Sequence, residues 1–130
     1  MCPEVEIGLS VPRPPIQLNG TLDAITLQGR DDPLIDITQA MQNYCQLRPP
    51  QLDSIHGYIF KSKSPSCGIQ KIPLFDGYGN INTFTQGVFV SAILQRFPTL
   101  PITDELTLID EAQWDIFLLH VKQYQNDHTR

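Results

Sequence analysis

Residues 61–68, KSKSPSCG, place a thiol among serine hydroxyls directly after HGYIF, a run that predicts a buried strand. The serines and the proline predict a polar loop at this point. Cys2 lies in a second irregular segment, next to Pro3. Loop side chains of this kind are commonly presented to ligands rather than packed. Cys2 and Cys67 are therefore candidate iron ligands, and Gly68 leaves room for backbone N–H groups near the sulfur, although two thiolates are too few for a stable iron–sulfur cubane.

The remaining cysteine and the histidines give weaker signals. Cys45 falls on the apolar face of a predicted helix, where a cysteine packs as a small hydrophobe, so we assign it to the core. His56, His120 and His128 are isolated, and neither their spacing nor any CxxC motif supports a zinc site. A nucleophile pair of Cys67 with His56 stays open, because such partners meet in space, but a lone histidine at a strand edge is more often structural.

Length and charge narrow the class of protein. The 130 residues predict one domain, 1–130, with residues 125–130 as a frayed tail. A net charge of -5 argues against broad nucleic-acid binding, although it leaves room for a local basic patch. The sequence contains no apolar run of membrane-spanning length, and its start does not resemble a secretion signal. We therefore expect a cytoplasmic protein.

Strand and helix patterns alternate along the chain. They predict an α/β domain with a mostly parallel central sheet flanked by helices. Residues 16–28 predict a peripheral β-hairpin that turns at Asn19-Gly20, and residues 54–62 predict the central strand. Residues 69–75 form an edge strand or an extended loop, because Pro73 cannot donate to a ladder. Ligands collect where loops leave the carboxyl ends of parallel strands, which is the position of residues 61–68.

Helices are predicted over residues 36–48, 84–97 and 109–125. The first has Asp36 or Thr38 as its N-cap and ends at two prolines. The second buries Phe84 among other side chains, and its Gly87 allows a close backbone approach. The third is amphipathic, with an apolar face formed by Ile109, Trp114, Phe117, Leu118 and Val121.

Two longer motifs resemble the DUF523 family, whose characterised members are bacterial thiouracil desulfidases. They are CPEVEIGLSVPRPP at residues 2–15 and GYIFKSKSPSCG at residues 57–68. Weaker matches follow in the expected order at residues 36–40, 87–94 and 96–101. The resemblance covers nearly the whole chain, and the two longer motifs rarely occur together.

This resemblance implies a [4Fe-4S] cluster on three cysteines, with one open iron that takes the sulfur of a thiolated pyrimidine, as free thiouracil or as thiouridine in RNA. Cys2 and Cys67 would be two of the ligands. Glu4 would be the acid–base group, and Ser64 a substrate or proton-transfer residue. A rigid Pro-rich segment holds Arg13. The predicted substrate contacts are Arg13, Ser66 and Gly68.

The sequence departs from the family at its start. Family members carry their first ligand cysteine in an N-terminal segment similar to SxCLxG, whereas here Met1 stands directly before Cys2. We expect the chain as given to be short of one cluster ligand and one strand, and a homodimer could cover the exposed edge. Two alternatives to a desulfidase follow. One is a non-catalytic binding or structural homodimer that kept the fold and lost the cluster, and the other is an enzyme that uses the Cys67 thiolate alone.

Overall fold

The computed structural model describes residues 3–8 and 14–128, and its mixture of helices and sheets confirms the α/β class. The helices are α1 (Pro3–Glu6), α2 (Thr38–Leu47), α3 (Val88–Arg96) and α4 (Glu111–His128), with 3-10 turns η1 (Pro49–Leu52) and η2 (Thr107–Ile109). The strands are β1 (Ile16–Thr21), β2 (Ala24–Gly29), β3 (Tyr58–Phe60), β4 (Ile72–Phe75), β5 (Ile81–Thr85) and β6 (Ile102–Asp104).

The larger sheet has the strand order β2-β1-β4-β5 and is mixed rather than mostly parallel. β1 runs antiparallel to β2 and parallel to β4, and β4 runs antiparallel to β5. The predicted hairpin forms, but it belongs to the main sheet because β1 is an inner strand. Its turn is Leu22-Asp23, whereas Asn19 and Gly20 lie inside β1. There the Asn19 amide donates to the Gln28 side chain across the ladder at 2.7 Å, a bond that only this register provides.

Two strands differ from their predicted positions in the sheets. β3, predicted to be central, pairs in parallel with β6 in a separate two-stranded sheet. β4 was predicted to be an edge strand or a loop because of Pro73, and this is wrong, since β4 lies between β1 and β5. The proline is tolerated because β1 pairs only with Leu74 and Phe75, so Pro73 stands outside that ladder and faces Phe84 of β5.

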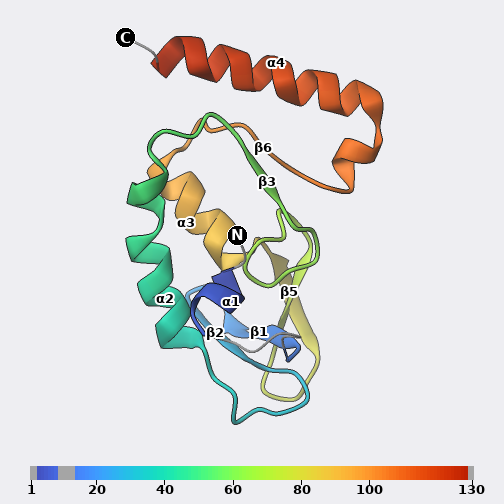
Figure 1. The fold of residues 1–130 in the computed structure, drawn as a ribbon. Coiled ribbons are helices and arrows are strands. Elements are labelled where there is room, and N and C mark those ends of the chain that lie inside the picture. The colour runs from blue at the N-terminus through green and yellow to red at the C-terminus, as the bar shows by residue number, and fades with distance from the viewer. Residues whose placement is uncertain (1–2, 9–13, 129–130) are drawn as a thin grey trace.

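α2 and α3 pack against the sheets through two apolar clusters (Figure 1). One cluster joins the main sheet to α2, and the other joins β3 to α3. Cys45 packs against both clusters, which supports its assignment to the core. The buried members of the two clusters are Leu18, Leu27, Ile37, Met41, Ile72 and Leu74, and Phe60, Cys67, Phe89, Val90, Ile93 and Leu100.

The helix boundaries follow from local hydrogen bonding. The N-cap of α2 is Ile37, without a side-chain cap, so the predicted N-cap at Asp36 or Thr38 is wrong. The Asp36 carboxylate accepts the Thr38 N–H at 2.9 Å just before the helix, and α2 ends before Pro49 as predicted. Hydrogen bonding from the Thr38 side chain, and then from its N–H, lowers the pKa of Asp36. The predicted helix over residues 84–97 begins later, at Val88, because the residues before it extend β5 along β4. Phe84 is therefore exposed on that edge strand instead of being buried.

α4 lies across one end of the molecule, apart from the main sheet (Figure 1). It continues to His128 through residues that the sequence assigned to a frayed tail. Of its predicted apolar face only Phe117 is buried, while Trp114 and Leu118 are exposed. Among the described residues, no helix is both long and apolar enough to cross a membrane.

Candidate active site

The loop over residues 61–68 is bound tightly to the start of α3. The Pro65 carbonyl accepts the Val88 N–H at 3.2 Å, and the Ser66 carbonyl accepts the N–H groups of Phe89 and Val90 at 2.8 and 3.2 Å. These carbonyls satisfy the N–H groups at the helix start, which has no side-chain cap. The loop backbone thus takes the place of an N-cap residue.

Gly87 makes this contact possible. A Cβ at position 87 would lie 2.5 Å from the Ser66 carbonyl oxygen and 2.8 Å from the Cys67 nitrogen, so no larger residue fits without moving the loop. The Gly87 N–H donates to the Gly68 carbonyl at 2.7 Å, which closes the loop from its other end. The close approach that the sequence predicted at Gly87 is confirmed, and the segment it approaches is the cysteine loop.

The Ser64 hydroxyl organises the inside of the loop. Its oxygen accepts the N–H groups of Ser66 and Cys67, both at 3.2 Å, and lies 3.0 Å from the Ser66 oxygen. The Ser64 carbonyl accepts the Gly68 N–H at 2.8 Å. One residue therefore sets the conformation of the turn that presents Cys67.

A line of oxygen atoms runs from Ser64 to a buried carboxylate. The Ser66 hydroxyl donates to Glu4 Oε2 at 3.1 Å. A hydroxyl has one proton to donate, so the Ser64 hydroxyl is the donor in its bond with Ser66. Ser66 is completely buried and Glu4 is 4% exposed. The arrangement Ser64–Ser66–Glu4 can pass a proton from the loop to a carboxylate that is almost completely buried.

Ser64 and Glu4 also line an open pocket of about 310 Å³. Three cationic side chains share its wall, those of Arg30, Lys61 and Lys63. Lys63 has a φ of 62°, a conformation that residues other than glycine rarely adopt and that clusters at functional sites. The pocket therefore combines a proton acceptor, a hydroxyl and positive charge, which suits a small polar or anionic ligand.

Contacts on two sides hold these groups in place. The Tyr44 hydroxyl donates to Glu6 at 2.6 Å and ties α1, which carries Glu4, to α2. At the other side, the Ser62 N–H and hydroxyl donate to the Glu105 carboxylate at 3.0 and 2.7 Å. The hydroxyl bond, followed by the N–H bond, lowers the pKa of Glu105.

Cys67 is the metal-ligand candidate that the structure describes. It is 5% exposed, and its sulfur lies 3.8 Å from the Ser66 hydroxyl oxygen. Across residues 3–8 and 14–128, no group of three or more His, Cys, Asp and Glu side chains could hold a metal ion. The position of Cys67 suits one thiolate ligand, and further ligands would have to come from outside the described residues.

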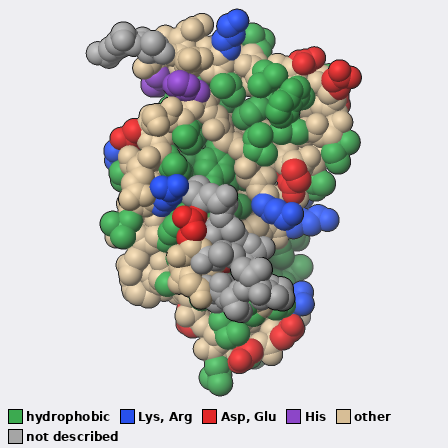
Figure 2. Space-filling model, viewed as in Figure 1, with side chains coloured by type: hydrophobic (Ala, Val, Ile, Leu, Met, Phe, Trp, Pro, Cys, Tyr) green, Lys and Arg blue, Asp and Glu red, His purple; other side chains and the backbone are tan. Residues whose placement is uncertain are grey.

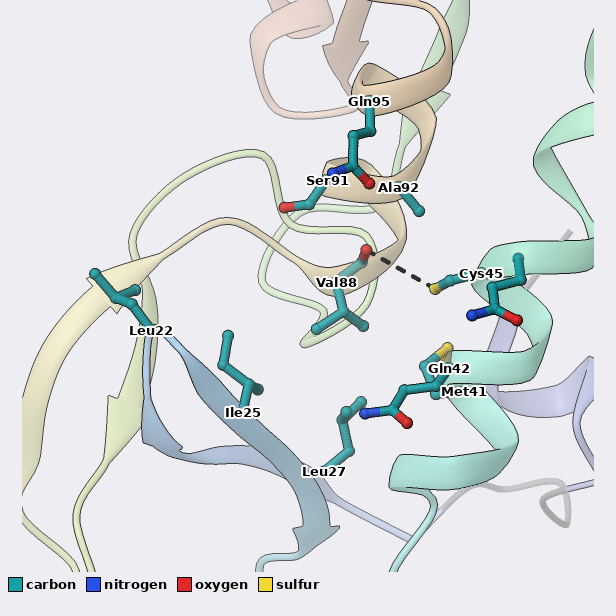
Figure 3. Close-up of a pocket in the computed structure, with 11 residues that line it drawn as sticks. Leu22, Ile25, Leu27, Met41, Gln42, Cys45, Val88, Ser91, Ala92 and Gln95 are labelled. Carbon is teal, nitrogen blue, oxygen red and sulfur yellow. Dashed lines mark hydrogen bonds between the residues drawn. The ribbon is translucent and has the colours of Figure 1, made fainter.

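Cys45 has different surroundings. Its thiol lies 3.8 Å from the Val88 carbonyl oxygen and lines a pocket of about 360 Å³, with mixed polar and apolar walls, between α2, α3 and the β1–β2 hairpin (Figure 3). Burial, and then the charge of Cys67, raise the pKa of Cys45 to about 11. Cys45 is thus surrounded as a packed core thiol, in contrast to Cys67 in its loop.

The structure brings together part of the predicted site. Glu4, Ser64 and Cys67 converge, while Cys2 and Arg13 lie outside the described residues. Ser66 and Gly68 were predicted to contact substrate, but both are buried behind the pocket wall. Ser66 links Ser64 to Glu4, and Gly68 closes the turn where a Cβ would lie 2.9 Å from the Ser64 carbonyl oxygen.

Sequence analysis missed the three cations of the pocket. Lys61 and Lys63 stand inside the quoted motif, and their alternation with serines at a strand end is a local signal that could have found them. Arg30 follows the β1–β2 hairpin and has no such signal, because only the fold brings β2 next to this loop. His56 lies against Tyr124 of α4, with ring centroids 6.3 Å apart, in agreement with a structural role.

Comparison with known proteins gave one family. The family model described as 2-thiouracil desulfurase matches residues 1–105, which include the whole candidate site. No curated protein and no solved structure matches the chain. The matched range ends before α4 begins.

Proposed function

Because the chain belongs to the 2-thiouracil desulfurase family, we propose that it removes sulfur from a thiolated pyrimidine, as the free base or within RNA. The observation that carries this proposal is the Ser64–Ser66–Glu4 line of hydrogen bonds at the wall of a cationic pocket, directly beside Cys67. The net reaction exchanges sulfur for oxygen. Water adds its oxygen to the carbon, the carbon–sulfur bond breaks, and the sulfur leaves as sulfide, with no change in oxidation state.

Different residues of the pocket have different roles in this hydrolysis. Glu4 accepts a proton from the attacking water, either directly or through Ser66 from Ser64. Arg30, Lys61 and Lys63 hold the pyrimidine oxygens and the negative charge that develops on the ring as water adds. Because Glu4 and Ser66 are buried, few bulk water molecules can exchange protons with these two groups.

We further propose that Cys67 and Cys2 bind a [4Fe-4S] cluster together with a third thiolate. Such a cluster would supply an open iron that takes the departing sulfur. The single residue between Cys2 and Glu4 supports this arrangement, because Glu4 is hydrogen-bonded to the neighbour of Cys67. The loop fixes the Cys67 backbone by its N–H bond to Ser64, so the thiolate would be held in one orientation.

The test separates cluster binding from chemistry. The chain is purified without oxygen, with and without an N-terminal segment of the SxCLxG type supplied, and assayed for iron, sulfide and conversion of 2-thiouracil or a 4-thiouridine oligonucleotide. We expect Cys67→Ser to lose iron and turnover together. Glu4→Gln is expected to keep its iron and to lower kcat by about a hundredfold or more, as removal of an acid–base group does.

Cys45→Ser is the matched control, since this thiol packs between the core clusters and should affect neither iron content nor turnover. Full iron content in Cys67→Ser would refute the ligand assignment. Wild-type turnover in Glu4→Gln would refute the role of the carboxylate. A protein that binds no iron and converts no substrate, with or without the supplied segment, would favour the non-catalytic alternative.

A further inference from the structure

α4 carries apolar side chains on two faces. Phe117, Val121 and Tyr124 recur at spacings of four and three and so lie on one face. This face packs on the body: Phe117 is 8% exposed, and a Cβ at Gly57 would lie only 2.7 Å from Val121 Cγ2. The helix is thus attached by a narrow strip.

The second face has no cover within the described part of the chain. Ala112, Ile116 and Leu119 repeat the same spacing away from the body, and Ile116 and Leu119 are 45% and 55% exposed. Figure 2 shows further hydrophobic side chains gathered near the N-terminal half of α4, on the side of the molecule turned to the viewer. Uncovered isoleucine and leucine side chains on one helix face indicate a surface that can bind a partner.

The charges beside this face indicate which partner fits. Asp115 and Lys122 lie about two helical turns apart on the same flank of the Ala112–Ile116–Leu119 face. Among the described residues, neither side chain takes part in an ion pair. A helix with an acid toward one end of the flank and a base toward the other is complementary to its own antiparallel copy.

We propose that the Ala112–Ile116–Leu119 face binds a second copy of the chain as an antiparallel pair of α4 helices. A two-fold axis between Ile116 and Leu119 places Ile116 against Leu119 of the second copy. The same axis places Asp115 beside Lys122 of the second copy, and this pair occurs twice. In a parallel pair the two copies of this flank would lie on opposite sides of the interface, so Asp115 and Lys122 would not meet. This dimer joins the ends of the two molecules that lie outside the family match, away from the candidate active site.

The mass of the full chain in solution tests the proposal. Sedimentation equilibrium should give twice the 14.7 kDa of one chain. Ile116→Glu and Leu119→Glu should each raise the dimer dissociation constant by about tenfold or more, because each buries a charge at the centre of the interface. Leu34→Glu, at a side chain that is 93% exposed in a loop, should leave the constant unchanged. Circular dichroism checks that each variant retains its helices.

Charge reversal tests the antiparallel register without disturbing the apolar face. Asp115→Lys alone and Lys122→Asp alone should each weaken the dimer, whereas the double variant D115K/K122D should restore it. An equimolar mixture of the two single variants should form a heterodimer in preference to either homodimer. A monomeric wild-type chain, or a dimer that none of these substitutions affects, would overturn the proposal.

Discussion

The cysteine loop and α4 differ in how completely their groups find partners inside the chain. In the loop, the polar groups of Ser64 and Ser66 bond to the loop itself, to α1 or to α3. In α4, only Phe117 is fully buried, and apolar side chains on the far face are exposed. The loop lies within the range that matches the family, and α4 lies beyond it. The comparison separates a site built by internal contacts from a surface whose contacts must come from another molecule.

Two buried phenylalanines test this difference most directly. Phe89 is completely buried at the start of α3, where its ring meets those of Tyr44, Tyr58 and Phe60. Phe89→Ala should lower the free energy of unfolding by ~3–5 kcal/mol. Phe117→Ala in α4 should cost less than Phe89→Ala, because Phe117 keeps 8% of its surface exposed whereas Phe89 has none. Urea denaturation measures both changes, and equal losses would show that α4 is as firmly packed as the body.

Gly87→Ala should give the next largest effect. The added Cβ meets the Ser66 backbone, which cannot yield without breaking the bonds at the start of α3, so we expect a loss of ~1–3 kcal/mol in unfolding free energy. Gly77→Ala is the matched control. It has open space around its Cβ position and no positive φ, and should be neutral or slightly stabilising. If the two variants were equally stable, the loop would not be locked as described.

Ser64→Ala should have a moderate effect on stability. It leaves the N–H groups of Ser66 and Cys67 without their acceptor and should cost about 1–2 kcal/mol. Ser91→Ala removes an exposed helical hydroxyl that bonds only to Gln86 and should change stability by less than ~0.5 kcal/mol. Thermal unfolding of the pair compares them, and a Ser64 variant as stable as the Ser91 variant would contradict the central role of this hydroxyl.

The smallest expected effect concerns Glu105 and depends on pH. Hydrogen bonds from Ser62 lower the pKa of this carboxyl in the folded chain, so the stability it contributes is present above its ordinary value of 4.5 and is lost as the pH falls through the lowered value. A double-mutant cycle of Ser62→Ala and Glu105→Gln should therefore show coupling at neutral pH that disappears in acid. Coupling that grew as the pH fell would reverse the assigned sign.

Much of the candidate site could be predicted from short sequence motifs. The SPSCG loop, the carboxylate of Glu4 and the small residue at position 87 each stand in short motifs whose chemistry can be interpreted without a fold. What the motifs could not indicate is which groups meet from different segments. Arg30 reaches the pocket from the hairpin, and Ser66 turns inward to bridge Ser64 and Glu4. Both depend on strand order and on the register of distant segments.

The parts of the fold that could be predicted are those where a sequence pattern is compatible with a single local structure. Alternating strands and helices indicated the α/β class, and prolines ended α2 at the expected place. The position of β4 was predicted wrongly because of Pro73. β5 pairs with β4 at Pro73, but β1 does not, so the missing N–H of the proline breaks no ladder with β1. The apolar periodicity of α4 was recognised, but periodicity does not tell whether the chain itself or a second molecule covers an apolar face.

The backbone cap of α3 has a consequence for the order of folding. The carbonyls that accept the first N–H groups of α3 belong to Pro65 and Ser66, and the whole β4–β5 hairpin separates them from the helix in sequence. A peptide spanning α3 alone would lack this cap and would fray at its start. The first turn of α3 is therefore capped only when the residues on both sides of the hairpin have come together. The candidate active site is assembled in that same step, because the carbonyls that start the helix belong to the loop that presents Cys67.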